Sequence, residues 1–152
     1  MCNRNNLRYK LIISISLSTS SLSGSEKFEQ RTDTNFRDAE QGNVDAQLNL
    51  GNMYMRGLGV TQDYKTAIRW FKLGAEQGNA NAQFSLGILY ANGFGVTQDY
   101  ARAYMWWNIA ALKGNTNAVA GRTAGQNVMT PTQIENAQVL ASKYMEKDFK
   151  GC

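Results

Sequence analysis

Residues 46–79 read AQLNLGNMYMRGLGVTQDYKTAIRWFKLGAEQGN, and residues 82–115 read AQFSLGILYANGFGVTQDYARAYMWWNIAALKGN. The two stretches align without a gap at a spacing of 36 residues, and 17 of the 34 aligned positions are identical. A repeat of this length is typical of helix pairs that stack along one axis and bury their apolar faces against their neighbours. The sequence therefore predicts an all-α fold, an α/α solenoid of antiparallel helix pairs with a 36-residue period, wound as a right-handed superhelix.

Each repeat predicts two helices. The first helix, which we call helix A, is expected over residues 44–55 and 80–91, and the second, helix B, over residues 64–76 and 100–112. Apolar side chains recur at every fourth position of helix A, which places them on one buried face. In the two repeats these are Ala46, Leu50, Tyr54, Ala82, Leu86 and Tyr90.

Glycine and aspartate recur at matching positions, where they indicate structural roles. Glycine inside helix A is unfavourable unless a partner helix approaches closely, and glycine after a helix permits a left-handed turn. Aspartate directly before helix B is a favoured N-cap. The residues given these roles are Gly51, Gly57, Gly59, Asp63, Gly87, Gly93, Gly95 and Asp99.

Partial units flank the two full repeats. Residues 31–42 resemble the end of a preceding helix B, and Asn117-Ala118 begins a third helix A. Thr130-Pro131-Thr132-Gln133 then predicts a capping box that opens a last helix, as suits a terminal cap. The predicted organisation is 1–24 signal peptide, 25–43 lead-in with a partial repeat helix, 44–79 unit 1, 80–115 unit 2, 116–147 degenerate capping unit and 148–152 tail.

The first 24 residues have the pattern of an export signal. Arg4, Arg8 and Lys10 precede a short apolar run over residues 11–17, and small residues follow. The run is shorter than the ~20 residues that a membrane span needs, so we expect no stable span. The protein is therefore predicted to be periplasmic or secreted; if the segment is only a disordered tail, the alternative is a cytoplasmic protein. Cleavage would leave Cys152 as the one cysteine, and its role stays open.

The pattern A-Q-x-x-L-G-x-x-Y-x-x-G-x-G-V-x-x-D-Y-x-x-A-x-x-W, read twice at a spacing of 36, resembles the Sel-one-like repeat (SLR) family, relatives of the tetratricopeptide repeats. The C-terminal MTPTQIENAQVLA segment, residues 129–141, is also similar to the endings of bacterial family members. The resemblance implies helical scaffolding, protein–protein contact and roles in envelope, secretion or signalling assemblies.

Composition argues against an enzyme. The chain has no histidine, which removes the commonest general base and the commonest metal ligand. The GxGV loops lack the third glycine and the preceding strand of a dinucleotide site. We therefore expect no catalytic residues, no metal and no cofactor. Arg4, Arg8 and Lys10 account for three of the four net positive charges, so the remainder is nearly neutral and offers no nucleic-acid groove.

The exposed side of helix A is the candidate partner-binding surface. At 100° per residue its side chains point away from the packed face, and in tetratricopeptide-like superhelices the A helices line the concave side. Amides pair with a peptide backbone and apolar positions with its side chains. The alternative is an ordinary solvated helix face. The candidate residues are Asn49, Asn52, Arg56, Ser85, Ile88 and Asn92.

Two other hypotheses remain open at this point. The aromatic residues could form a stacking platform for sugars, with Trp107 or Tyr104 exposed, and the protein would then be an envelope module that binds carbohydrate or peptidoglycan. An intracellular regulatory adaptor is the alternative if the N-terminal segment is not a signal. The truncated first unit also predicts an apolar edge that could form a homodimer.

Overall fold

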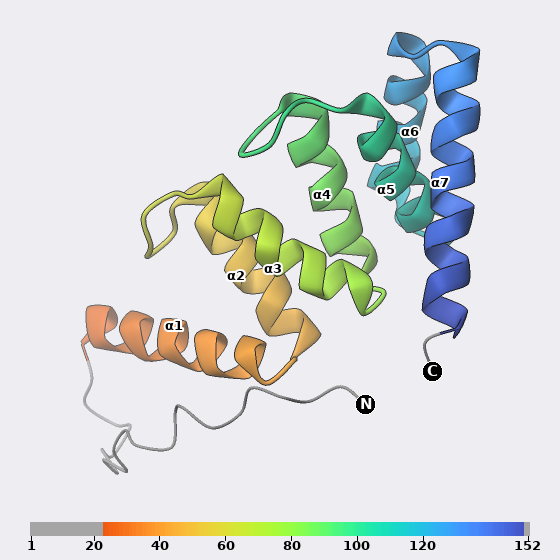
Figure 1. Cartoon of the computed structure of the whole chain (residues 1–152). Coiled ribbons are helices and arrows are strands. Elements are labelled where there is room, and N and C mark those ends of the chain that lie inside the picture. The colour runs from red at the N-terminus through yellow and green to blue at the C-terminus, as the bar shows by residue number, and fades with distance from the viewer. Residues whose placement is uncertain (1–22, 151–152) are drawn as a thin grey trace.

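A computed structural model describes residues 23–150 of the chain (Figure 1). All regular structure within these residues is helical. Successive helices stack from the N-terminal to the C-terminal end of the molecule, which is the predicted α/α solenoid. The helices are α1 Gly24–Glu40, α2 Val44–Arg56, α3 Tyr64–Glu76, α4 Ala80–Asn92, α5 Tyr100–Leu112, α6 Thr116–Val128 and α7 Pro131–Lys150.

The helix pairs α2–α3 and α4–α5 are the two predicted repeats, and helix A is one residue longer than expected in each. Asp63 and Asp99 cap helix B as predicted: the side chain of Asp63 accepts from the backbone N–H of Lys65 and Thr66, and that of Asp99 from Arg102. The first turn of each helix A is capped by an asparagine that the sequence analysis did not single out. These are Asn43, Asn79 and Asn115, whose Oδ1 atoms accept from the backbone N–H of Ala46, Ala82 and Ala118 at 2.9–3.0 Å.

Two glycines inside helix A permit the close packing that the sequence predicted. A Cβ atom on Gly51 would collide with the ring of Phe71, and one on Gly87 with the indole of Trp107. Both aromatic residues lie on helix B of the same repeat, and Phe71 is fully buried. Close contact between the helices of a pair therefore depends on the missing side chain.

Glutamine residues link each helix A to the end of the preceding helix B. Gln47 Nε2 donates to the carbonyl of Ala39, and Gln83 Nε2 donates to that of Ala75. Both glutamines are buried. Gln47 also accepts from Gln77 Nε2 at 2.8 Å, so its amide is bonded at both ends. The bonds to Ala39 and Ala75 tie each helix A to the unit before it through buried polar groups, whereas the Gln47–Gln77 bond lies within unit 1.

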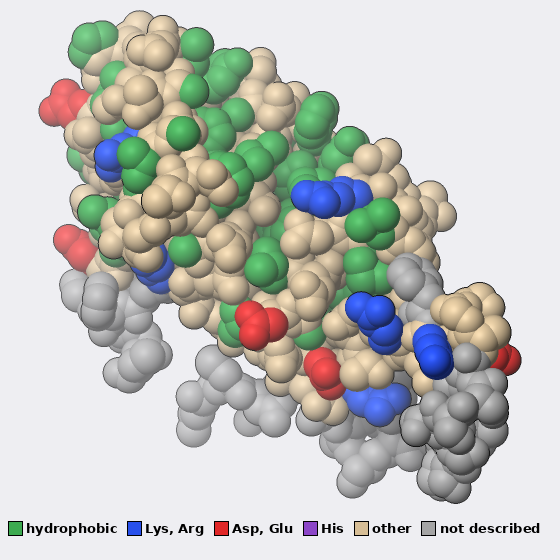
Figure 2. Space-filling model, turned by 180° about the vertical axis from the view of Figure 1, so that it is seen from behind, with side chains coloured by type: hydrophobic (Ala, Val, Ile, Leu, Met, Phe, Trp, Pro, Cys, Tyr) green, Lys and Arg blue, Asp and Glu red, His purple; other side chains and the backbone are tan. Residues whose placement is uncertain are grey.

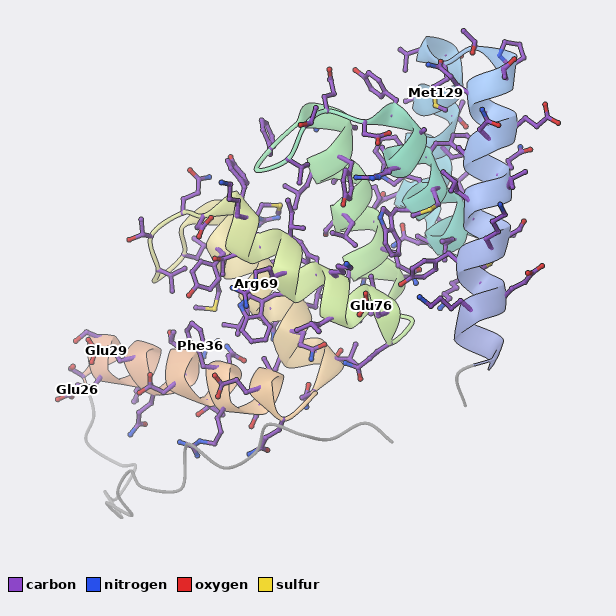
Figure 3. All side chains as sticks on the ribbon, in the orientation of Figure 1. Glu26, Glu29, Phe36, Arg69, Glu76 and Met129 are labelled. Carbon is purple, nitrogen blue, oxygen red and sulfur yellow. The ribbon has the colours of Figure 1, made fainter. Side chains whose placement is uncertain are left out.

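At the N-terminal end, α1 is the whole of a preceding helix B and not only its last turns. Ser23 and Glu26 form a capping box at its start. The ring of Phe36 lies 6.1 Å from that of Tyr54 and 6.5 Å from that of Trp70, both edge-on. Figure 3 shows Phe36 rising from α1 toward the helices above it. Helix α1 therefore covers the apolar side of α2.

At the C-terminal end, α7 packs against α5, whereas a regular repeat would place it on α6. The sequence explains this departure. Gly51 and Tyr54 pack against helix B of their own repeat, but Thr123 and Gln126 stand at the corresponding positions of α6 and are exposed. The link from α6 to α7 is also only residues 129–130. A polar face and a short link leave no place for a regular helix B.

Instead, α7 closes the core over α5. The ring of Tyr144 lies 4.8 Å from that of Trp106, and Ala141 is fully buried. The predicted capping box at Thr130 and Gln133 is confirmed, with both of its hydrogen bonds present. The helix continues to Lys150, so residues 148–150 belong to it and not to a tail.

Candidate partner-binding surface

Helices α2, α4 and α6 are the three A helices, and they follow one another along one side of the solenoid. In Figure 1 α3 passes in front of α2 and α5 in front of α6, so Figure 2, seen from behind, shows the A-helix side. We call the outward stripe of these helices the helix-A face. Its members recur at intervals of three and four residues, as one side of a helix requires. They are Asp45, Asn49, Asn52 and Arg56 on α2, Asn81, Ser85, Ile88 and Asn92 on α4, and Asn117, Gly121, Ala124 and Val128 on α6.

The structure brings the six predicted residues onto this face but buries one of them. Asn49, Arg56 and Asn92 are exposed, and Asn52 and Ile88 are half-buried. Ser85 is only 8% exposed, so the prediction that it is accessible to a partner is wrong. Helix α4 lies between the A helices α2 and α6, and these two neighbours cover part of its middle turn, where Ser85 lies.

Six further members of the face escaped the sequence analysis. Asp45 and Asn81 lie one turn closer to the N-terminus of their helices than the predicted residues, and the other four, Asn117, Gly121, Ala124 and Val128, lie on α6. Extending the same 3.6-residue period by one turn, and the 36-residue period by one repeat, would have found them. Every one of these six except the half-buried Gly121 is exposed.

Several polar side chains on the face have unused hydrogen-bonding capacity. Asn49, Asn52 and Arg56 form no hydrogen bond or ion pair with any other residue between 23 and 150. Asn92 Nδ2 donates to the carbonyl of Ile88 at 2.8 Å, which leaves its Oδ1 oxygen available. Asn81 Oδ1 is already occupied by Asn115 Nδ2 at 2.9 Å. The α2 part of the face thus offers the most free donors and acceptors.

Trp107 and Tyr104 do not form the exposed sugar-stacking platform considered above. Trp107 is 7% exposed and Tyr104 is 1% exposed, so the expectation that one of them joins a binding surface is wrong. Trp107 Nε1 donates to the carbonyl of Phe84, and Tyr104 OH accepts from Gln126 and Gln138. Their polar atoms are therefore used inside the fold.

The two GxGV loops are structural turns. Gly57 and Gly93 adopt left-handed φ angles of 68° and 69°, which close helix A as predicted. Phe94 stacks on Tyr64 of the preceding repeat, with ring centroids 4.9 Å apart. A Cβ atom on Gly95 would lie 2.7 Å from the Cβ of Tyr64, so this glycine permits the loop to rest on α3. The second loop therefore joins the two repeats.

Asp63 is, with Glu26, an acid whose pKa is lowered by its hydrogen bonds. Thr66 Oγ1 donates to its Oδ2 oxygen at 2.6 Å, and the N–H groups of Thr66 and Lys65 donate to its other oxygen. These bonds, first that from the Thr66 side chain, hold the pKa of Asp63 below its usual value of 3.8. Between residues 23 and 150 no group of three His, Cys, Asp or Glu side chains is placed to hold a metal ion.

The ends of the chain bear on its location and assembly. Residues 1–22, and with them most of the predicted signal, lie outside the described residues, as do Cys2 and Cys152. No helix between residues 23 and 150 is long and apolar enough to cross a membrane. The N-terminal edge expected to form a homodimer is covered by α1, whose exposed residues are mainly charged or polar.

The fold and this surface together define an α-helical repeat protein. Residues 44–79 and 80–115 match the family model of the Sel1 repeat, so the chain contains two complete Sel1 repeats. Sel1 repeats are generally protein-interaction scaffolds and typically non-catalytic. No curated protein matches the chain.

Two solved structures are similar in fold and sequence. One is a protective antigen present in uropathogenic Escherichia coli strains that displays an SLR fold; it is 33% identical, with a TM-score of 0.78 over 83% of this chain. The other is a Sel1 repeat protein from Oxalobacter formigenes, 35% identical, with a TM-score of 0.57 over 62% of this chain. The chain spans 27% and 38% of the lengths of these two proteins.

Proposed function

We propose that this protein is a non-enzymatic scaffold that holds an extended segment of a partner protein against the helix-A face. The observation that carries the proposal is the row of side-chain amides with unused hydrogen-bonding capacity, Asn49, Asn52 and Asn92, on adjacent A helices. Amides of this kind pair with the N–H and C=O groups of an extended backbone. Half-buried Ile88 lies one turn before Asn92 on α4 and offers an apolar contact.

Site-specific photocrosslinking tests this proposal. A photoreactive p-benzoylphenylalanine is placed at Asn52 or Asn92, and a matched control carries it at Lys72. Lys72 lies on α3, and its side chain is 61% exposed. Each variant of the full chain is irradiated in an extract of the source organism. We expect discrete protein adducts from positions 52 and 92 and none from position 72. Equal labelling at all three positions, or labelling only at position 72, would overturn the proposal.

We also propose that the chain is exported. Basic residues followed by a short apolar run support this location, and the similar Escherichia coli protein is described as an antigen. Sequencing the N-terminus of the protein purified from its own cells tests the proposal. We expect a mature chain that begins close to residue 25, and an intact N-terminal segment on the cytoplasmic protein would contradict it.

Assembly into a homodimer through the N-terminal edge would have to use the outer side of α1, because α1 covers the apolar residues behind it. Exposed charged residues on α1 include Glu29, Arg31, Arg37 and Glu40. A contact of this kind would be screened by salt. Sedimentation at high protein concentration measures whether the protein dimerises. A monomer at low salt would contradict a homodimer through α1.

A further inference from the structure

Charge is distributed very unevenly between the helices. The chain has 28 charged residues, 16 basic and 12 acidic, yet none lies on α4. Helix α6 has one, Arg122, which is half-buried and donates to Asn108 Oδ1 of α5, away from the helix-A face. The part of the face that belongs to α4 and α6 is therefore free of charge. Burial does not account for this, because Asn81, Asn92 and Asn117 are exposed and uncharged.

Figure 2 shows the same division on the A-helix side. Charged side chains lie toward the end of the molecule where α1 lies and also along the opposite edge, whereas hydrophobic and uncharged side chains cover most of the surface between them. The two charged members of the helix-A face, Asp45 and Arg56, are both on α2. One end of the face thus offers electrostatic contacts and the other does not.

The uncharged part of the face offers two kinds of contact. Asn81, Asn92 and Asn117 supply amides, and Ile88, Ala124 and Val128 supply apolar surface, with Val128 59% exposed. A charged side chain laid here would give up part of its hydration and find no opposite charge in return. A segment with amide, hydroxyl or aliphatic side chains gives up much less hydration free energy when it docks.

We propose that α4 and α6 select an extended peptide segment without charged side chains, and that electrostatic contacts with the partner are confined to Asp45 and Arg56 on α2. This inference rests on the proposed function and names the chemistry of the segment that the same face takes. Specificity would then come from the uncharged stretch of the partner. The binding of that stretch would be nearly independent of salt.

Selection from a phage-displayed library of random 12-residue peptides tests the inference. The full chain is the bait, and enriched peptides are synthesised and titrated at about 0.05 M and 0.5 M salt. We expect the enriched peptides to contain fewer Asp, Glu, Lys and Arg residues than the unselected library. Their dissociation constants should differ less than about twofold between the two salt concentrations, since surface charge contacts are the salt-sensitive ones.

A matched pair of variants shows where the peptides bind. Val128→Asp introduces a charge on the helix-A face, and Val139→Asp introduces the same charge on α7, where the valine is 46% exposed. We expect Val128→Asp to weaken binding at least about tenfold and Val139→Asp to leave it unchanged, with circular dichroism confirming that both fold. Ala124→Asp is a second variant on the face and should behave as Val128→Asp does.

The outcomes separate this inference from the function on which it rests. Peptides that bind on the face but are rich in charged residues, with binding that falls about tenfold in high salt, would overturn the inference and leave the scaffold function standing. Peptides unaffected by Val128→Asp and Ala124→Asp bind elsewhere, and that result would contradict both. A selection that enriches no peptide over bare support would also contradict both.

Discussion

Gly87 shows how a single missing side chain sets the distance between two helices. The indole of Trp107, on α5, occupies the space that a Cβ on Gly87 would need. Its Nε1 donates to the carbonyl of Phe84, which lies on α4 one turn before Gly87. Glycine in a helix interior normally destabilises a protein relative to alanine. Here the close contact outweighs this intrinsic penalty.

We therefore predict that Gly87→Ala lowers the free energy of unfolding by about 1–3 kcal/mol, the usual effect of overpacking. The control is Gly125→Ala on α6, where an added Cβ would meet Trp107 and Tyr104 at an ordinary 3.5 Å. That variant should be more stable than the wild type by up to about 1 kcal/mol, through helix propensity. Urea denaturation measures both. A Gly87→Ala protein as stable as the wild type would contradict this account of the helix pair.

Asp63 links a single carboxyl group to the start of α3. Because its pKa is lowered in the folded state, its charge stabilises the fold above the usual value of 3.8, and this contribution is lost as the pH falls through the lower, folded-state pKa. Thr66→Val removes the hydroxyl that contributes most to the shift, so we predict that the pKa of Asp63 rises toward 3.8 and that stability depends less on pH in this range. Thr66→Ser keeps the hydroxyl and should titrate as the wild type does. NMR titration of the carboxyl carbon measures this; identical pKa values in all three proteins would contradict it.

At the scale of elements, Gln47 and Gln83 both link helix A to the preceding helix B, but only Gln47 has both ends of its amide hydrogen-bonded. Gln47 is bonded at both ends of its amide, to Ala39 and Gln77. Gln83 donates to Ala75, but its buried Oε1 oxygen has no partner within the described residues. Lys113 stands where Gln77 stands in the first repeat, and it donates to the carbonyl of Gly78 instead.

We predict that Gln47→Leu destabilises the protein by about 1–3 kcal/mol, because it removes two hydrogen bonds at once. Gln83→Leu should have a smaller effect, since it removes one hydrogen bond and also one unpaired buried oxygen. Thermal unfolding of the two variants under one set of conditions compares them directly. An equal or larger loss in Gln83→Leu would show that the Oε1 oxygen is not unpaired in solution.

The elements differ in how far the sequence could predict them. The bounds of α2 to α5 were predictable to about a residue because capping residues and turn glycines act locally. The glutamine links were not, since residues 47 and 83 bond to a different repeat and their burial depends on the stacking. The position of α7 was not predictable either: Thr123 and Gln126 signal that α6 lacks a regular partner, but no local pattern indicates that the helix packs on α5.

At the scale of the whole molecule, two Sel1 repeats form the centre, and α1 and α7 close the two ends. Placing the predicted residues on the outward side of helix A needed only helical periodicity and the repeat register, and five of the six are exposed or half-buried there. Ser85, Trp107 and Tyr104 were placed wrongly, because their burial is decided by neighbouring helices that one repeat does not reveal. The charge-free part of the face became visible only when α4 and α6 were seen side by side.

The central claim is that the helix-A face holds an extended protein segment. The most direct test is a ¹H–¹⁵N NMR titration of the full chain with a peptide obtained by the library selection. The account predicts that the largest shift changes fall on the outward stripe of α2, α4 and α6, including the side-chain amides of Asn49, Asn52 and Asn92. Shift changes concentrated on the outer sides of α3, α5 and α7, or on the loops 57–63 and 93–99, would contradict it.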